Sequence, residues 1–293
     1  MRESFLKYIQ FEKRYSAHTV TSYENDLNQF TTFIDQHFPG TTLEGCSHPV
    51  IRNWIVSLMD TGLDPRTINR KIACLRSFYK FLLKREMIED DPMRKIQALK
   101  TSKKLPQFIN EKDMNRLLDH VTFEKNFSGA RDRLILELLY GTGTRLAEIL
   151  QLKDVDIDLS QRTLKVLGKR NKERMIPFSI SLKTILESYI QVRNANDLQD
   201  DEGFLIVTDD GKKCYPMLIY RTVKHYLDLF TTIEKRSPHV LRHTFATHLL
   251  NKGAELNAVK DLLGHTSLAA TQVYTHNSIE KLKTVFDQAH PKA

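Results

Sequence analysis

The chain has 293 residues, of which 41% are hydrophobic and 27% charged, an ordinary composition for a globular protein. This length accommodates two domains comfortably. The 44 basic and 36 acidic residues give a net charge of +8 at pH 7, which favours a polyanionic partner without requiring one.

The cysteines and the absence of long apolar runs predict the compartment. Cys46, Cys74 and Cys214 are scattered and form no C-x-x-C spacing, which argues against a disulfide framework or a structural zinc site. No stretch of the sequence has the pattern of a signal peptide or the length of an apolar membrane span. We therefore expect a soluble, cytoplasmic protein with no membrane insertion.

Residues 1–97 are predicted to form an all-helical domain. Apolar residues recur at helical spacing along 20–34 and along 68–82, where Asp64 and Pro65 begin the second helix. The other side of that helix is basic. Such charges usually form a solvated face. Here, however, only one acidic residue, Glu86, lies near them to balance the charge, so a surface that faces phosphates is an equal alternative. The candidate DNA-binding residues here are Arg66, Arg70, Lys71, Arg76 and Lys80.

A basic linker is predicted over residues 98–106. It lacks apolar periodicity and ends at Pro106. Its Lys103 and Lys104 could follow a DNA backbone, although a merely flexible linker would have the same composition.

Residues 107–293 are predicted to form a second, mixed domain. Asn110 is a candidate cap of one helix, 134–139 is strongly apolar and helical, and 145–152 resumes a helical pattern with Thr144 as its cap. The strand-like segments 163–167 and 174–178 predict an antiparallel hairpin with a basic tip. A further short strand is expected over 204–207, and helices from Met217 onward. The expected fold class is mainly α (α+β) with a small antiparallel β-sheet.

The last sixty residues hold the densest cluster of candidate site residues. Ser237 and Pro238 predict a helix start, which places His239 and Arg242 on one helical face. His239 and His243 are four apart, as in a zinc-binding helix. However, Val240 stands where an H-E-x-x-H motif has its glutamate, so we expect no metal there.

Two further positions follow in the same region. Gly264 fits a helix C-cap, which displays His265 on the following turn, and a short helix then leads to Tyr274. Tyr274 is one of ten tyrosines, and a tyrosine by itself is most often a core or hydrogen-bonding residue. Only the residues around Tyr274 make it a candidate site residue.

These residue types suit attack of a phenol on a phosphodiester. A phenol, with an ordinary pKa of about 10, needs a base or a strongly positive site in order to lose its proton. Two guanidiniums, Arg145 and Arg242, can hold the non-bridging oxygens of the pentavalent transition state. Lys169, at the hairpin tip, can protonate the departing 5′-oxygen. This inventory needs neither a metal nor another cofactor.

The motifs together resemble those of the tyrosine recombinase (phage integrase) family, and within it the XerC/XerD-like bacterial recombinases. The resemblance covers nearly the whole chain. In the first domain it rests on residues 16–27 and 75–79. In the second it rests on Gly-Thr-Gly-Thr-Arg (141–145), His-x-x-Arg-His (239–243) and the segment from Leu262 to His276.

The resemblance implies a role for each catalytic candidate. Tyr274 would form a covalent 3′-phosphotyrosyl bond, Arg145 and Arg242 would bind the scissile phosphate, and Lys169 would protonate the leaving oxygen, with His239 and His265 completing the site. Arg170 stands where the family more often has glycine, and Lys172 is an alternative to Lys169. Arg170 and Lys172 are further DNA-binding candidates.

The resemblance also implies an architecture. A helical core-binding domain and a catalytic domain would form a C-shaped clamp around duplex DNA. Four protomers, identical or paired with a paralogue, would act on two sites, with the segment Ile279–Phe286 packing into a neighbouring subunit. The expected activity is ATP-independent, site-specific recombination in a nucleoid-associated bacterial protein, as in chromosome dimer resolution.

Three alternatives remain open. An integrase of a mobile element would share all these motifs. A non-catalytic DNA-binding architectural protein is disfavoured, because all six candidate catalytic positions hold chemically competent residues. A type IB topoisomerase shares the chemistry but would relax supercoils without a partner site, so assembly of a tetramer on paired sites discriminates against it.

Overall fold

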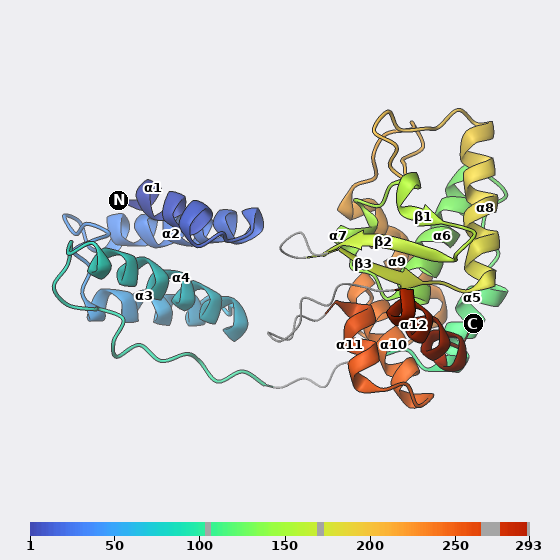
Figure 1. The fold of residues 1–293 in the computed structure, drawn as a ribbon. Coiled ribbons are helices and arrows are strands. Elements are labelled where there is room, and N and C mark those ends of the chain that lie inside the picture. Colours follow the sequence, from blue (N-terminus) through green and yellow to red (C-terminus); the bar gives the residue numbers. More distant parts are fainter. Residues whose placement is uncertain (103–106, 169–172, 265–275, 292–293) are drawn as a thin grey trace. The chain divides into compact units, whose positions relative to one another are not determined.

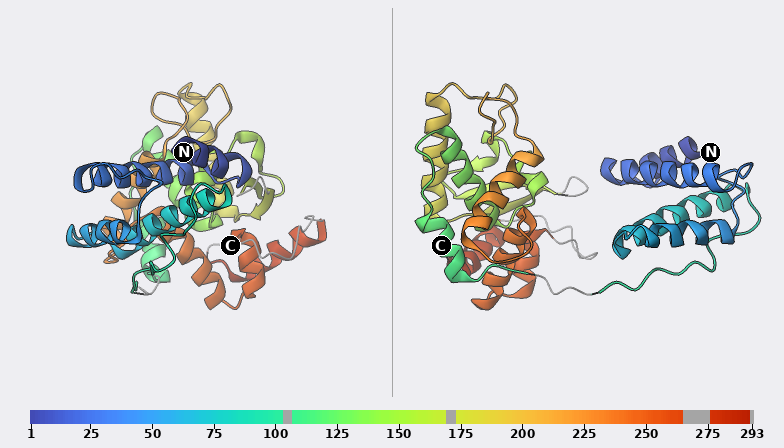
Figure 2. Two further views of the ribbon diagram at one scale, coloured as in Figure 1. Left: turned by 90° about the vertical axis from the view of Figure 1, so that its left-hand side faces the viewer. Right: turned by 180° about the vertical axis from the view of Figure 1, so that it is seen from behind.

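The computed structural model describes residues 1–102, 107–168, 173–264 and 276–291, with the side chains of the last stretch described from Lys283 onward. The chain divides into two compact units, Met1–Lys104 and Leu105–Ala293 (Figures 1 and 2). Each unit has a hydrophobic core of its own. Each is therefore described by itself.

The described part of the first unit is helical, as the sequence predicts. Its elements are α1 (Arg2–Lys7), a π-helical turn (Tyr8–Glu12), α2 (Ala17–His37), α3 (His48–Asp60) and α4 (Pro65–Lys84). The predicted stripes of α2 and α4 face each other in the core. Asp64 caps α4 by accepting a hydrogen bond from the Arg66 amide at 2.8 Å, and Pro65 supplies a helical φ at the first position.

The second unit consists of helices around a small sheet (Figure 1). The long helix α6 lies at its centre and contacts α8, α9 and α10. The helices are α5 (Glu111–His120), α6 (Phe127–Thr142), α7 (Leu146–Ile149), a 3-10 turn (Asp154–Asp156), α8 (Ile180–Ala195), α9 (Pro216–Phe230), α10 (Pro238–Asn251), α11 (Leu256–Leu263) and α12 (His276–Ala289). The mainly α class with a small antiparallel sheet is thus confirmed.

The sheet has the antiparallel order β1 (Ile157–Asp158), β2 (Thr163–Leu167), β3 (Glu173–Pro177). The hairpin is as predicted, with β3 beginning one residue earlier, and β1 adds a strand that the sequence did not predict. Val166 lies opposite Arg174, and both are buried. The period of two therefore places the charged Arg174 on the core face of β3, together with Ile176.

Three local predictions were wrong or incomplete. Thr144 does not cap α7, because Arg145 occupies the N-cap position. Residues 204–207 form isolated bridges with Lys153 and Lys213 in place of a strand. Helix α8 was not predicted.

Helix α12 contacts β3, α10 and α11 of the same unit. Phe286 is fully buried there, and its ring stacks on His290 with centroids 4.7 Å apart. Both rings lie near Phe245 of α10. Within this single chain the C-terminal helix therefore covers its own core.

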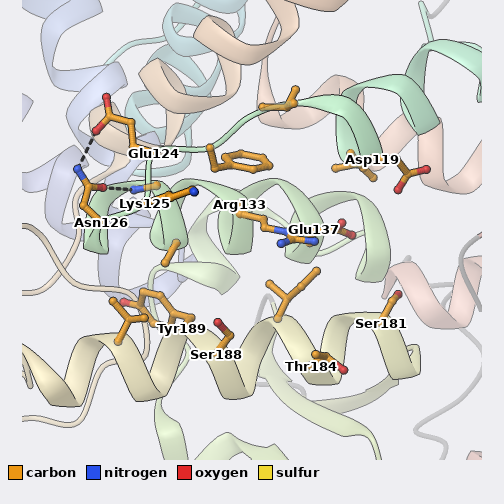
Figure 3. Close-up of a pocket in the computed structure, with 17 residues that line it drawn as sticks. Asp119, Glu124, Lys125, Asn126, Arg133, Glu137, Ser181, Thr184, Ser188 and Tyr189 are labelled. Carbon is orange, nitrogen blue, oxygen red and sulfur yellow. Dashed lines mark hydrogen bonds between the residues drawn. The ribbon is translucent and has the colours of Figure 1, made fainter.

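The start of α6 depends on a close backbone approach at Gly129. Asn126 caps the helix by accepting from the Gly129 amide at 2.9 Å and donates to Glu124 at 2.8 Å, so the loop folds over the first turn (Figure 3). A Cβ at Gly129 would lie 2.1 Å from the carbonyl oxygen of Glu124. Only glycine fits there without a backbone shift.

We predict that Gly129→Ala destabilises the second unit by about 1–3 kcal/mol, the usual cost of overpacking. The measurement is urea-induced unfolding followed by circular dichroism. Gly141→Ala is the matched control in the same helix, because its Cβ would meet only Leu182 at 3.5 Å. The control should be neutral or stabilising; equal losses in both variants would contradict the steric explanation.

Candidate active site

Arg145 lies at the turn between α6 and α7. Gly143 ends α6 in the left-handed conformation with φ of 61°. A Cβ on Gly143 would lie 2.4 Å from the Phe245 ring, so this turn requires glycine for both conformation and space. The turn leaves the Arg145 side chain about a third exposed.

Arg242 lies on α10, which begins at Pro238 as predicted. The side chain is 7% exposed and donates hydrogen bonds to two backbone carbonyls, of Gly143 and of Leu263, both at 2.5 Å. Burial lowers the pKa of Arg242 to about 10, and the neighbouring charge of Arg145 adds to this effect. The guanidinium therefore remains charged at neutral pH.

Glu148 joins these arginines to the sheet. Its carboxylate accepts from the Arg145 amide and from the Arg145 guanidinium, both at 2.7 Å. Arg174 of β3 binds it in a bidentate fork with two distances of 2.9 Å. Arg242 lies 3.9 Å from the same carboxylate. Three guanidiniums thus surround one buried carboxylate and leave a net charge of about +2 by simple counting.

The cluster of Arg145, Glu148, Arg174 and Arg242, hereafter the arginine cluster, is suited to bind an anion. A guanidinium has five N–H donors, more than the described contacts of Arg145 or Arg242 use. Planar donor forks match the oxygens of a phosphate. The exposure of Arg145 gives such a ligand access from the surface.

The structure brings together two of the predicted catalytic residues, Arg145 and Arg242. His239 lies three residues before Arg242 on α10 and is exposed. The other predicted catalytic residues, Lys169, His265 and Tyr274, lie outside the described residues, as do the DNA-binding candidates Lys103, Lys104, Arg170 and Lys172.

Sequence reasoning missed Glu148 and Arg174. The first had a local signal, since it follows Arg145 by three residues, the spacing of an N-cap and its partner. For Arg174, the only signal in the sequence was that it alternates with the apolar residues of β3. Its partners lie 26 and 88 residues away, so no local pattern could assign them.

The basic side of α4 differs from the prediction at one position. Arg66, Arg70, Arg76 and Lys80 are exposed, but Lys71 is 4% exposed and binds Asp26 at 2.9 Å and also Gln29. The 3.6-residue period turns Lys71 toward α2, where a buried carboxylate neutralises it. The prediction that Lys71 belongs to an exposed basic surface was therefore wrong.

Other candidate sites are poorly supported. Among the described residues, no group of three or more His, Cys, Asp or Glu side chains could hold a metal ion, and no helix is both long and apolar enough to cross a membrane. A groove of about 770 Å³ lies between the loop before α6 and helices α6 and α8 (Figure 3), and its lining includes none of the arginine cluster.

Comparisons with known proteins identify the family. Residues 107–281 match the phage integrase family, and residues 3–86 match the phage integrase N-terminal SAM-like domain. The chain belongs to the phage integrase family. It is 36% identical to tyrosine recombinase XerC of Chlorobaculum tepidum (99% of this chain, 94% of that protein). It is 37% identical to tyrosine recombinase XerC of Bacillus subtilis (99% and 95%).

Two solved structures with bound DNA share the fold. The XerH recombinase bound to a palindromic difH substrate matches with a TM-score of 0.73 at 22% identity (97% of this chain, 83% of that one). The Tn1549 transposon integrase with transposon right end DNA matches with a TM-score of 0.71 at 19% identity (97% and 98%). With the family match and the XerC relatives, the chain is a tyrosine-type site-specific DNA recombinase, an enzyme that breaks and rejoins DNA strands.

We predict that the arginine cluster makes the second unit acid-sensitive. Burial raises the pKa of Glu148, but the hydrogen bonds and charge of Arg174, aided by those of Arg145, outweigh it and bring the pKa from 4.5 to about 2. A folded-state pKa below the unfolded one stabilises the fold above about pH 4.5, and this contribution, about 3 kcal/mol, is lost as the pH falls toward 2.

Urea-induced unfolding at pH 6 and at pH 2.5 measures this contribution. The wild type should exceed Glu148→Gln in stability by more at pH 6 than at pH 2.5. A constant difference between the two proteins would show that the carboxylate does not carry the effect.

Proposed function

We propose that the chain is a XerC-like recombinase that cleaves duplex DNA with Tyr274. Arg145 and Arg242 bind the scissile phosphate, and Lys169 protonates the leaving 5′-oxygen. His239 and His265 assist in hydrogen bonding and proton handling. The supporting observation is the arginine cluster, which holds Arg145 and Arg242 around one carboxylate with excess positive charge.

The proposed chemistry is a transesterification. The Tyr274 oxygen attacks phosphorus as its phenol proton passes to a neighbouring histidine, His239 or His265. The bond from phosphorus to the 5′-oxygen breaks, a 3′-phosphotyrosyl bond forms, and the leaving oxygen takes a proton from Lys169. The two guanidiniums stabilise the charge on the non-bridging oxygens. Because the phosphotyrosyl bond conserves the energy of the phosphodiester, rejoining by a 5′-hydroxyl needs no ATP.

The domain assignment forms part of the proposal. Residues 1–97 are the core-binding domain, 98–106 the linker and 107–293 the catalytic domain, which is supported by the two family matches and the two compact units. We further infer that both domains clamp duplex DNA and that four protomers assemble on two sites. On assembly the C-terminal segment, which in the single chain packs on its own core, would pass to a neighbouring protomer. The protein would act in the cytoplasm at the nucleoid.

The biological role proposed is chromosome dimer resolution, because full-length relatives at 36–38% identity are named XerC. Integration of a mobile element uses the same chemistry. Mapping covalent adducts on genomic DNA distinguishes the two roles. Adducts at one chromosomal site support dimer resolution, whereas adducts at the ends of a mobile element would refute dimer resolution.

We predict that Tyr274→Phe abolishes covalent attachment to a nicked suicide substrate, since only the phenol oxygen can form the bond. The assay is denaturing gel electrophoresis with labelled DNA. Binding of the uncleaved duplex should remain within about twofold of the wild type. Adducts formed by the variant would refute the assignment of Tyr274, and a wild type without adducts would refute the catalytic proposal.

We also predict that Lys80→Ala weakens DNA binding uniformly across sequences and lowers the slope of log K against log[salt] by about 1, as expected for one lost phosphate contact. Fluorescence anisotropy at several salt concentrations measures the slope. Lys112→Ala on α5, also exposed, is a control of equal charge. Equal slopes for wild type and Lys80→Ala would remove this side of α4 from the DNA interface.

A further inference from the structure

Three consecutive carbonyls at the end of α11 each accept a hydrogen bond from a different arginine. Arg174 Nε donates to Leu262 at 2.9 Å, Arg242 to Leu263 at 2.5 Å, and Arg145 to Gly264 at 3.3 Å. The last carbonyls of a helix lack intrahelical partners and carry its negative dipole end, so guanidiniums are favourable there. The helix end thereby fixes the spacing of the three arginines.

Arg174 differs from the other two in what it can reach. It is 4% exposed, and Nε, Nη1 and Nη2 are all engaged, with Leu262 and with both oxygens of Glu148. Its side chain also closes over Gly264, where a Cβ would lie 3.1 Å from it. All the described hydrogen bonds of Arg174 go to Leu262 and Glu148, and both terminal nitrogens are held by that one carboxylate, which suits a role that Arg174 exerts through its neighbours.

We propose that Arg174 is a positioning residue for strand cleavage: it holds the Glu148 carboxylate in a bidentate fork so that this charge does not neutralise Arg145 and Arg242. This inference rests on the proposed function. The inference adds to the proposed function a third arginine, which leaves the two phosphate-binding arginines free to bind the scissile phosphate.

The charge balance gives the reason. With Arg174 present, three guanidiniums share one carboxylate. Without it, the buried carboxylate has only Arg145, at 2.7 Å, and Arg242, at 3.9 Å, as charged partners. At low dielectric that attraction strengthens, and the carboxylate then competes with the phosphate oxygens for the same N–H groups.

The decisive variant is Arg174→Met, which keeps the unbranched stem of the side chain to about the position of Nε and removes the fork. Single-turnover cleavage of a suicide duplex should slow about 10- to 100-fold, the range expected for loss of a charged hydrogen-bonding partner. The affinity for the same duplex should stay within about twofold, because the proposed role of Arg174 is exerted through Glu148 and not by binding DNA. Arg174→Lys keeps the charge but not the fork, so its cleavage rate should lie between those of the wild type and Arg174→Met.

The double variant Arg174→Met/Glu148→Gln separates charge from architecture. If Arg174 acts by restraining the Glu148 charge, removing that charge should restore cleavage at least about fivefold over Arg174→Met alone. A merely structural role would make the double variant as slow as the single one or slower.

Arg193→Met is the matched control. Arg193 is likewise buried and binds Asp154 through two bonds of 3.0 and 2.7 Å, but it lies on α8 and touches no member of the arginine cluster in the described contacts. It should lower the melting temperature without changing the cleavage rate of the folded fraction.

The outcomes are separable. Wild-type cleavage by folded Arg174→Met overturns the inference, as does a double variant no faster than the single one. If Arg174→Met does not fold, Arg174→Lys decides, and a wild-type rate for it overturns the inference. Absence of adducts in the wild type, or adducts in Tyr274→Phe, refutes the proposed function instead.

Discussion

The pairing of one buried carboxylate with three arginines is the constraint on which the active-site region depends. Glu148 lies at the first turn of α7, Arg174 on β3 and Arg242 on α10, so the charge network joins elements that are distant in sequence. A carboxylate removed from water is costly unless it is fully hydrogen-bonded, and Arg174 and Arg145 meet that requirement. The same requirement holds the arginines in a fixed arrangement.

Two glycines make this arrangement possible. Gly143 ends α6 and Gly264 ends α11, both with left-handed backbones, and each passes close to a side chain of the site region, Phe245 and Arg174 respectively. Their turns present carbonyls to the guanidiniums of Arg242 and Arg145. Helix ends that would otherwise be unsatisfied thus become part of the site, and the hydrophobic core beneath keeps them rigid.

This region keeps an excess of positive charge. The repulsion between the arginines is unfavourable, and the packing and hydrogen bonds of the surrounding fold offset it. The arginines hydrogen-bond to carbonyls and to one carboxylate, so none is buried without partners, yet the sum of charges still favours an anion. This excess of positive charge is the physical ground on which we propose phosphate binding at this site. In the first unit, Asp26 is likewise shared by two cations, Lys71 and Arg70, but Lys71 is buried against it and serves packing between α2 and α4.

The sequence alone predicted many of the helix ends, the hairpin of β2 and β3, and the candidates Arg145 and Arg242 that the structure brings to one carboxylate, because caps, periodicity and short motifs are local. Asp64, Asn110, Ser237 and Gly264 mark helix ends in the structure as their residue types predict. Only the tertiary structure decided that Lys71 is buried and that Arg174 and Glu148 bind each other. Those outcomes depend on which helix or strand packs opposite a side chain, and contacts across 26 to 88 residues leave no periodic trace in the sequence.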